Sequence, residues 1–219
     1  MSVLNDPAIE QILTDLHSRS DAQLAEIEQY VIGARRSRSA TREEDFKLYR
    51  SDKLLAIRRD KAESCYQICR AIDARQIVEI GTSYGVSTLY LAAAVRDNIN
   101  AGGGSGLITA TEYEPSKVIA AMEVFRRAGL SQIIRLLKGD FRETLKKIDA
   151  PVDLVLIDAW KDAPPLALEM MEPWLRSGSI VLCDDMDLQP KEYHEALIGH
   201  GFRTVTLPFR DGLGLSIRC

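Results

Sequence analysis

The sequence predicts an α/β protein built on one open, mostly parallel β-sheet. Short apolar runs alternate with helical stretches from residue 77 onward, which is the pattern of βαβ units whose sheet is covered by helices on both faces. A chain of 219 residues suits one domain with a sizeable core. The composition, 46% hydrophobic and 27% charged, is that of a globular protein.

The first 55 residues are predicted to form a helical extension, and residues 56–219 the main domain. Apolar residues recur at helical spacing between residues 5 and 32. Asn5-Asp6-Pro7 is a helix-start signal, and "SRSDAQ" predicts the start of a second helix, capped by Ser20 or Asp21. The polar run "GARRSRSATREED" is interpreted as a mobile loop, and residues 52–73 are predicted to be helical. The apolar face of this extension must be buried, either over the ligand pocket or against a second subunit.

Five strands are predicted in the main domain, at residues 77–80, 106–111, 133–138, 152–157 and 179–183. Helices are predicted between them at residues 87–96, 116–128, 142–148 and 166–175. The tail differs, because "FRTVTLPF" and "LGLSIRC" are two β-like runs joined by the turn signal "RDG". This arrangement predicts an antiparallel pair at the edge of the sheet.

Charge and hydropathy weigh against several classes of partner. The net charge of −4 and the pI near 5.5 disfavour nucleic acid as the main partner. No apolar run approaches the roughly 20 residues needed to span a bilayer, and "MSVLNDPAIEQ" lacks the basic and apolar regions of a signal peptide. The cytoplasm is therefore the expected location. Cys65 and Cys69 lie within a helical pattern without a second ligand pair, so buried thiols are expected rather than a zinc site.

The stretch "IVEIGTSYGVSTLY" is a strand, a glycine turn and a helix start. It does not suit a phosphate, because Ser83 stands where a dinucleotide fingerprint has its middle glycine and no P-loop lysine follows. Glu79, at the end of the strand, would repel phosphate and attract an ammonium group. Glu112 ends the second strand, where a carboxylate can accept both hydroxyls of a ribose. The combination fits S-adenosylmethionine; the alternative is that both acids are ordinary polar residues at strand ends.

Six motifs then occur in order: "VEIGTSYGVSTLYLA", "ITATEYEP", "LKGDFRETL", "VDLVLIDAWKD", "GSIVLCDDM" and "DGLGLSIR". Together they resemble the cation-dependent small-molecule O-methyltransferases of the catechol and caffeoyl-coenzyme A type, over about residues 60–219. "LIDAWKD" followed by "LCDDM" is the most specific part. The resemblance implies a Rossmann-like class I methyltransferase fold, with a seven-stranded, mostly parallel sheet and an antiparallel C-terminal strand. It also implies that residues 56–219 form an S-adenosylmethionine-dependent methyltransferase domain.

The resemblance also implies site residues. The cofactor would lie against Glu79, Gly81, Ser83, Tyr84, Gly85, Ser87, Glu112, Tyr113, Asp140, Phe141 and Asp158. Glu79, Gly81 and Ser87 would line its methionine end, and Asp140 and Phe141 would flank the adenine. A divalent cation would be bound by Asp158, Asp184 and Asp185. An all-oxygen site suits Mg²⁺, Mn²⁺ or Ca²⁺ better than a soft metal, and Mg²⁺ is the first expectation. Asp158 and Lys161 would be catalytic, and Trp160 would line the acceptor side of the pocket.

The implied chemistry is methyl transfer to a hydroxyl. A phenol has a pKa of about 10, so a bound cation that stabilises the phenolate would help, and Lys161 could accept the proton or stabilise the oxyanion. Two adjacent oxygens would chelate the metal best, which favours a catechol-like or other vicinal diol group, and the expected acceptor is a small catechol-like or phenolic natural product. Asp185 departs from the family, which usually has asparagine there. Its extra charge could tighten metal binding, raise a carboxylate pKa or signal a changed role, and Asp184 or Asp185 could instead cap the following turn.

Other functions stay open. Arg35, Arg36, Arg38 and Arg42 could touch RNA, as in a transfer RNA hydroxyuridine methyltransferase of the same fold, although a solvated loop is the simpler interpretation. A non-catalytic Rossmann-like binding protein is a further alternative, whereas the glycine pattern disfavours an NAD-dependent oxidoreductase. The sequence thus predicts an O-methyltransferase with a small hydroxylated acceptor, neither nucleic acid nor membrane as partner, and a homodimer.

Overall fold

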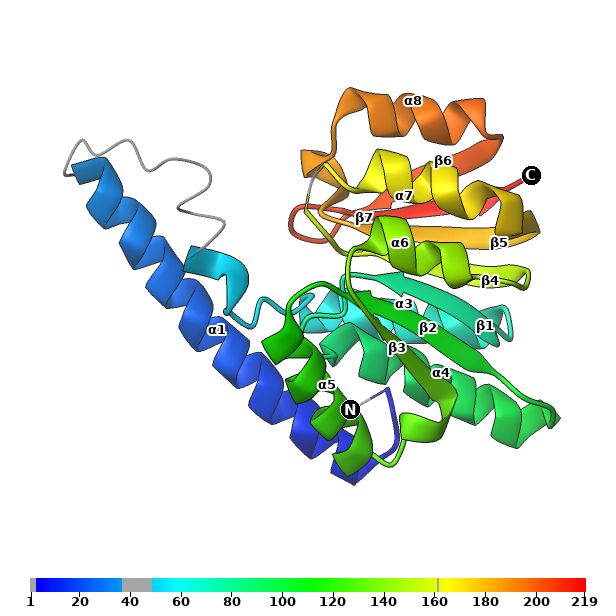
Figure 1. The fold of residues 1–219 in the computed structure, drawn as a ribbon, viewed down its shortest axis with the longest axis horizontal. Coiled ribbons are helices and arrows are strands. Elements are labelled where there is room, and N and C mark those ends of the chain that lie inside the picture. The colour runs from blue at the N-terminus through cyan, green and yellow to red at the C-terminus, as the bar shows by residue number, and fades with distance from the viewer. Residues whose placement is uncertain (1–2, 37–48, 161) are drawn as a thin grey trace.

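The computed structural model describes residues 3–36, 49–160 and 162–219, which form a seven-stranded sheet flanked by helices (Figure 1). The strand order is β3-β2-β1-β4-β5-β7-β6. The strands are β1 Gln76–Ile80, β2 Leu107–Glu112, β3 Ile134–Lys138, β4 Val152–Ile157, β5 Leu175–Asp184, β6 Phe202–Leu207 and β7 Leu213–Arg218. The pairs among β1 to β5 are parallel, whereas β7 is antiparallel to both β5 and β6. The predicted fold class is confirmed.

Helices cover both faces of this sheet. They are α1 Pro7–Arg36, α3 Arg59–Ala71, α4 Val86–Gly102, α5 Pro115–Arg127, α6 Phe141–Thr144, α7 Pro164–Met171 and α8 Lys191–Gly199. Short 3₁₀ turns are η1 Ser131–Ile133, η2 Leu145–Lys147, η3 Glu172–Trp174 and η4 Met186–Leu188. In Figure 1, α6, α7 and α8 lie on one side of the sheet and α3 and α4 on the other.

The core has two parts because successive side chains of a strand point to opposite faces. In β4, Leu154 and Leu156 join the cluster beneath α3 and α4, while Val155 and Ile157 join the cluster beneath α7 and α8. The same alternation runs through β1 and β5. Strands buried on both faces explain why the sequence shows continuous apolar runs rather than an alternation.

The N-terminal region corrects one prediction. A single helix, α1, runs through Ser20, where a second helix was predicted to begin. Ser20 is 2% exposed, and its hydroxyl accepts a hydrogen bond from the backbone N–H of Ala56 at 3.0 Å. The serine that resembled a cap is therefore a buried contact between α1 and a later segment. Figure 1 shows the C-terminal end of α1 extending away from the sheet.

Other boundaries also differ from prediction; the helix predicted over residues 166–175, for example, is α7 Pro164–Met171. The helix predicted over residues 52–73 begins only at Arg59, because residues 54–58 are extended or irregular. Strand β5 begins at Leu175 rather than at Ser179, with a register shift against β4 between Val152 and Leu154, and Gly178 within this strand has φ +87°. The antiparallel tail is confirmed, with β6 at the sheet's edge.

Within the described residues, no helix is both long and apolar enough to cross a membrane. Cys65, Cys69 and Cys183 are buried free thiols, and Cys219 is exposed. The prediction of buried thiols at Cys65 and Cys69 is confirmed, and desolvation raises the pKa of both.

Candidate active site

The polar residues singled out in the sequence meet at one edge of the sheet. Register pairs Ile80 with both Thr111 and Ile157, and Ile157 with Cys183. The residues that follow these positions, Gly81, Glu112, Asp158 and Asp184, therefore lie side by side at the carboxyl ends of parallel strands. This is the edge at which open α/β sheets bind their ligands.

Glu79 is a fully buried carboxylate. Its Oε2 accepts hydrogen bonds from the hydroxyls of Thr82, at 3.1 Å, and Thr88. Its Oε1 is buried and has no hydrogen-bond partner among the described residues. Burial raises the pKa of Glu79 to about 7 despite the hydroxyl hydrogen bonds. A buried carboxylate oxygen without a partner is costly, so this site is suited to a bound cation such as an ammonium group.

The turn after β1 is tightly constrained. Gly81 has φ +98°, and a Cβ there would lie 1.8 Å from the carbonyl oxygen of Asp158. Gly85 has φ +85°, and a Cβ there would lie 2.5 Å from the Phe125 ring. Both positions thus require glycine for conformation and for space. Gly85 is also the N-cap of α4, so the turn presents the positive end of a 17-residue helix, with Ser87 in its first turn.

Glu112 is fixed by backbone donors on both carboxylate oxygens. Oε2 accepts from the N–H of Ser83 at 2.7 Å, and Oε1 accepts from the N–H of Glu114 at 2.8 Å. Each oxygen keeps a second lone pair for another donor, which matches the predicted role toward a pair of hydroxyls. The Ser83 Oγ is buried and, within the described residues, has no hydrogen-bond partner.

The predicted adenine side is less well supported. The carboxylate of Asp140 caps α6 and is bound by Arg142, whose hydrogen bonds lower the pKa of Asp140. Phe141 packs against the core cluster beneath α7 and α8, and Tyr113 is 66% exposed. Tyr113 thus faces solvent, and the carboxylate of Asp140 is already paired with Arg142.

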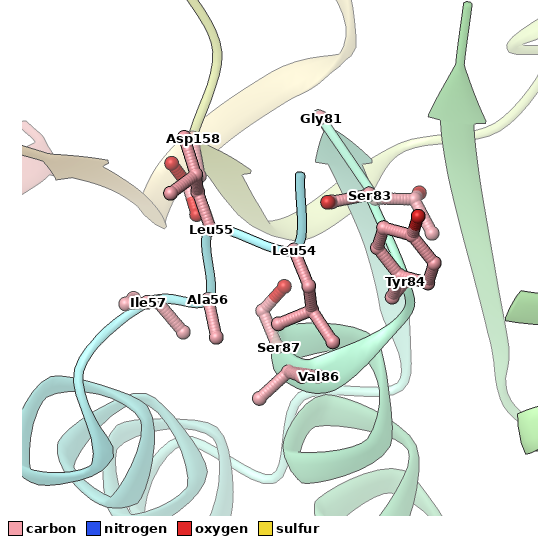
Figure 2. Close-up of a pocket in the computed structure, with 11 residues that line it drawn as sticks. Leu54, Leu55, Ala56, Ile57, Gly81, Ser83, Tyr84, Val86, Ser87 and Asp158 are labelled. Atoms are coloured by element: carbon pink, nitrogen blue, oxygen red, sulfur yellow. The ribbon is translucent and has the colours of Figure 1, made fainter. Parts of the chain in front are cut away.

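A segment that sequence reasoning missed covers the turn. Residues 54–57, here called the covering segment, line a pocket with residues 81–84, Val86, Ser87 and Asp158. Figure 2 shows Leu54 and Leu55 lying between Asp158 and the turn that carries Ser83 and Tyr84.

The covering segment is held by polar contacts from other elements. Gln23 Oε1 on α1 accepts a hydrogen bond from the N–H of Leu54 at 2.5 Å, and the Ser20 hydroxyl accepts one from the N–H of Ala56. The Tyr84 hydroxyl donates to the carbonyl of Asp52 at 2.7 Å. Tyr84 therefore holds the chain just before the covering segment, and its predicted contact with the cofactor stays a prediction.

The acidic end of β4 and β5 contains a lysine that sequence reasoning also missed. Lys61, on α3, is 1% exposed, and its Nζ donates to Asp184 Oδ1 and, at 3.2 Å, to Asp185 Oδ1. Burial disfavours the charged lysine, but the hydrogen bonds and charges of the two aspartates raise its pKa above the ordinary value. Burial and the neighbouring carboxylates raise the pKa of Asp184, and raise that of Asp158 further. No local pattern marks Lys61 in the sequence, because its partners lie more than 120 residues away.

The donor set does not fit the predicted metal. Asp158, Asp184 and Asp185 were expected to bind a divalent cation together, yet no three His, Cys, Asp or Glu side chains of the described residues are grouped so as to hold one. Asp184 Oδ1 already accepts from Lys61 and, at 2.8 Å, from the N–H of Asp185. The alternative that Asp184 caps the following turn agrees with this last bond.

Trp160 lies close to Asp158 in the chain and is 45% exposed. The Arg50 guanidinium lies 5.3 Å from the centre of its ring. Burial lowers the pKa of Arg50, and the charge of Asp185 opposes that effect. The predicted catalytic Lys161 lies outside the described residues, as do Arg38 and Arg42, and the side chains of Arg35 and Arg36 are likewise not described.

Comparison with known proteins identifies the family of this chain. Residues 78–186 match a family described as a methyltransferase domain. The chain is 31% identical over 169 residues to a Mycolicibacterium smegmatis protein assigned to the O-methyltransferases, covering 69% of this chain and 77% of that one. The chain belongs to the O-methyltransferase family.

Other members of the family are matched over shorter stretches. The catechol O-methyltransferase of Mycobacterium tuberculosis is 31% identical over 117 residues, which is 53% of this chain and 50% of that protein. The chain thus spans about half the length of this relative. The match supports the family without extending to the relative's whole length.

Solved structures of O-methyltransferases share the fold. TomG of Streptomyces achromogenes, named for tomaymycin synthesis and solved with S-adenosylmethionine, has a TM-score of 0.64 at 24% identity, covering 75% of this chain and 82% of TomG. A Bacillus cereus O-methyltransferase solved with S-adenosylhomocysteine has a TM-score of 0.63 at 17% identity, covering 96% and 100%. At these identities the likeness shows the fold alone.

Proposed function

We propose that this family member transfers a methyl group from S-adenosylmethionine to a hydroxyl oxygen of a small acceptor. The observation that carries the proposal is the pair of carboxylates, Glu79 and Glu112, at the ends of neighbouring strands on either side of the glycine turn. Family membership supports it, as do the two solved relatives that were crystallised with the methyl donor or its product.

The residues present fit such a cofactor. Glu79 would bind the ammonium of the methionine moiety through its unpartnered Oε1. The amino end of α4, with Ser87, would bind the carboxylate. Glu112, oriented by the amides of Ser83 and Glu114, would bind the ribose hydroxyls. Bound S-adenosylmethionine supplies an electrophilic methyl group.

The protein's contribution to the chemistry is to orient the acceptor and take its proton. Asp158 lines the pocket beside Gly81, and a carboxylate whose pKa burial has raised is a stronger base than a free aspartate. We propose that Asp158 accepts the acceptor's hydroxyl proton. Lys161 as a second catalytic group stays a prediction.

The acceptor class is proposed as a phenol. The exposed ring of Trp160 offers a surface for an aromatic acceptor, and one relative is named a catechol O-methyltransferase. No step is assigned to Mg²⁺, because the carboxylates of the described residues are not arranged to bind it.

Calorimetry with S-adenosylmethionine and with NAD, on the full chain, tests the cofactor. We expect saturable binding of S-adenosylmethionine alone, weakened in Glu79→Gln. Methyl transfer from labelled S-adenosylmethionine to a panel of mono- and dihydroxylated phenols then tests the reaction. Binding of NAD in place of S-adenosylmethionine, or binding without transfer to any phenol, would contradict the proposal.

A further inference from the structure

Lys61 and three aspartates form a charged cluster inside the candidate site. Asp184 Oδ1 and Asp185 Oδ1 both accept from the Lys61 Nζ. Asp158, at the end of the neighbouring strand, is coupled to the same lysine by charge. Lys61 is 1% exposed, so the ammonium of these ion pairs is buried and does not lie on the protein surface. Its ammonium donates to two of these three carboxylates.

We propose that the Lys61 ammonium is the resident cation of this site and that the chain uses no divalent metal there. The inference deepens the proposed function, on which its relevance to methyl transfer rests. Its basis is the geometry of the ion pairs that Lys61 forms with Asp184 and Asp185.

The position of Lys61 is built into the fold. Its backbone N–H donates to Asp60 Oδ1 at 2.9 Å, within the first turn of α3. Cys65, one helical turn later, is buried and lies within electrostatic reach of Asp184, Asp158 and Glu79. The face of α3 that carries Lys61 and Cys65 is therefore turned toward the acidic ends of β1, β4 and β5.

Oxygens of Asp184 and Asp185 accept hydrogen bonds from Lys61 and are not arranged around a metal ion. A metal ion needs several oxygen ligands converging on one point at about 2.0–2.6 Å. Here Asp184 Oδ1 accepts from Lys61 and from the N–H of Asp185, and Asp185 has φ +50° and a half-exposed side chain. Among the described residues, no three His, Cys, Asp or Glu side chains are placed so that together they could hold a metal ion.

The departure at Asp185 has a role in this arrangement. Asparagine would offer a neutral oxygen to a metal, but aspartate offers a charge to the lysine. A buried ammonium requires paired carboxylates and hydrogen bonds, because burying an unpaired charge is strongly unfavourable. Asp185 supplies the second of these carboxylates, so the Asp-Asp pair and Lys61 are matched to one another.

A consequence concerns the acceptor. Without a metal to chelate, a second adjacent hydroxyl on the acceptor has no ligand role. The site therefore accepts phenols with one hydroxyl as readily as catechols, subject to the fit against Trp160.

Direct metal binding tests the proposal without relying on turnover. Metal-free full-length protein is titrated with Mn²⁺, and bound ion is followed by electron paramagnetic resonance. The wild-type chain and Lys61→Arg are expected to show no stoichiometric site. Lys61→Met, which removes the ammonium but keeps the side chain's bulk, is expected to bind one Mn²⁺ at least tenfold more tightly than wild type. Lys191→Met removes an exposed lysine paired with Glu195 at 2.7 Å and is expected to resemble wild type.

Each result decides the question. Stoichiometric Mn²⁺ binding by the wild type overturns the proposal, whatever the variants do. A folded Lys61→Met that gains no Mn²⁺ site also overturns it, because the lysine would then not be what occupies the cation position. If Lys61→Met fails to fold, the wild type and Lys61→Arg decide. S-adenosylmethionine calorimetry on the same samples separates the two proposals, since loss of cofactor binding counts against the proposed function and leaves the Mn²⁺ result standing.

Discussion

The pKa of Glu79 makes a quantitative prediction about the stability of the unliganded protein. The group titrates at about 7 in the folded chain and near 4.5 when exposed, so the folded state holds the proton more tightly than the unfolded state. Its contribution to stability is fully present below pH 4.5 and is lost as the pH rises through 7. Each pH unit between the two pKa values corresponds to about 1.4 kcal/mol, which gives a total loss of about 3 kcal/mol in the free energy of unfolding.

Urea denaturation of wild type and Glu79→Gln at pH 5, 6, 7 and 8 measures this loss. Asp158 and Asp184 also have raised pKa values and contribute a slope of the same sign, so the difference between the two proteins isolates Glu79. We expect the wild type to lose more unfolding free energy with rising pH than the variant does. Parallel pH profiles would refute the assignment of a raised pKa to Glu79.

The same group links pH to cofactor binding. An ammonium beside Glu79 favours the carboxylate form, so binding of S-adenosylmethionine between pH 5 and 6.5 is expected to release a proton. Affinity should then rise by up to about tenfold per pH unit, and Glu79→Gln should remove this dependence. Calorimetry in buffers of different ionisation enthalpy measures the proton release.

Three other predictions concern the turn, the ribose site and the covering segment. Gly81→Ala should be destabilised and lose S-adenosylmethionine binding, because its Cβ would lie 1.8 Å from the carbonyl oxygen of Asp158. Gly178→Ala is the control in thermal denaturation: Gly178 also has a positive φ, but a Cβ there would meet no atom within 4 Å, so this variant measures the cost of backbone strain alone. Glu112→Ala should weaken S-adenosylmethionine binding at least about tenfold, since hydrogen bonds to a charged group are worth about 1.5–3 kcal/mol, and unchanged affinity by calorimetry would place the ribose elsewhere. Ser20→Ala should cost about 1 kcal/mol of stability and speed cleavage near residues 54–57 in limited proteolysis; protection equal to wild type would show that Ser20 does not hold this segment.

The homodimer predicted from the N-terminal extension stays a prediction. Leu24 and Ile32 on α1 are 41% and 49% exposed, which leaves apolar surface on that helix. Sedimentation of the full chain at micromolar concentration measures the assembly directly.

The acidic residues at the strand ends, and their meeting at one edge of the sheet, could be predicted from the sequence. Apolar runs separated by helices require a parallel sheet, and the carboxyl ends of parallel strands share one edge. Glu79, Glu112, Asp158 and Asp184 each follow or end such a run, so their meeting at this edge follows from a periodicity that is local to each strand. The glycine spacing after β1 is equally local, and its mismatch with the dinucleotide fingerprint is enough to disfavour a pyrophosphate at this turn.

Only the tertiary structure decided what surrounds those acids. Lys61 arrives from a helix that precedes the sheet, and residues 54–57 reach the pocket because Ser20 and Gln23 hold them there. Neither contact leaves a sequence signal, since a lysine at the start of a helix and a serine within one are common on protein surfaces. The local pattern fixes which residues end the strands, whereas the charge that those residues face depends on how distant elements pack, and here that packing sets Lys61 against Asp184 and Asp185.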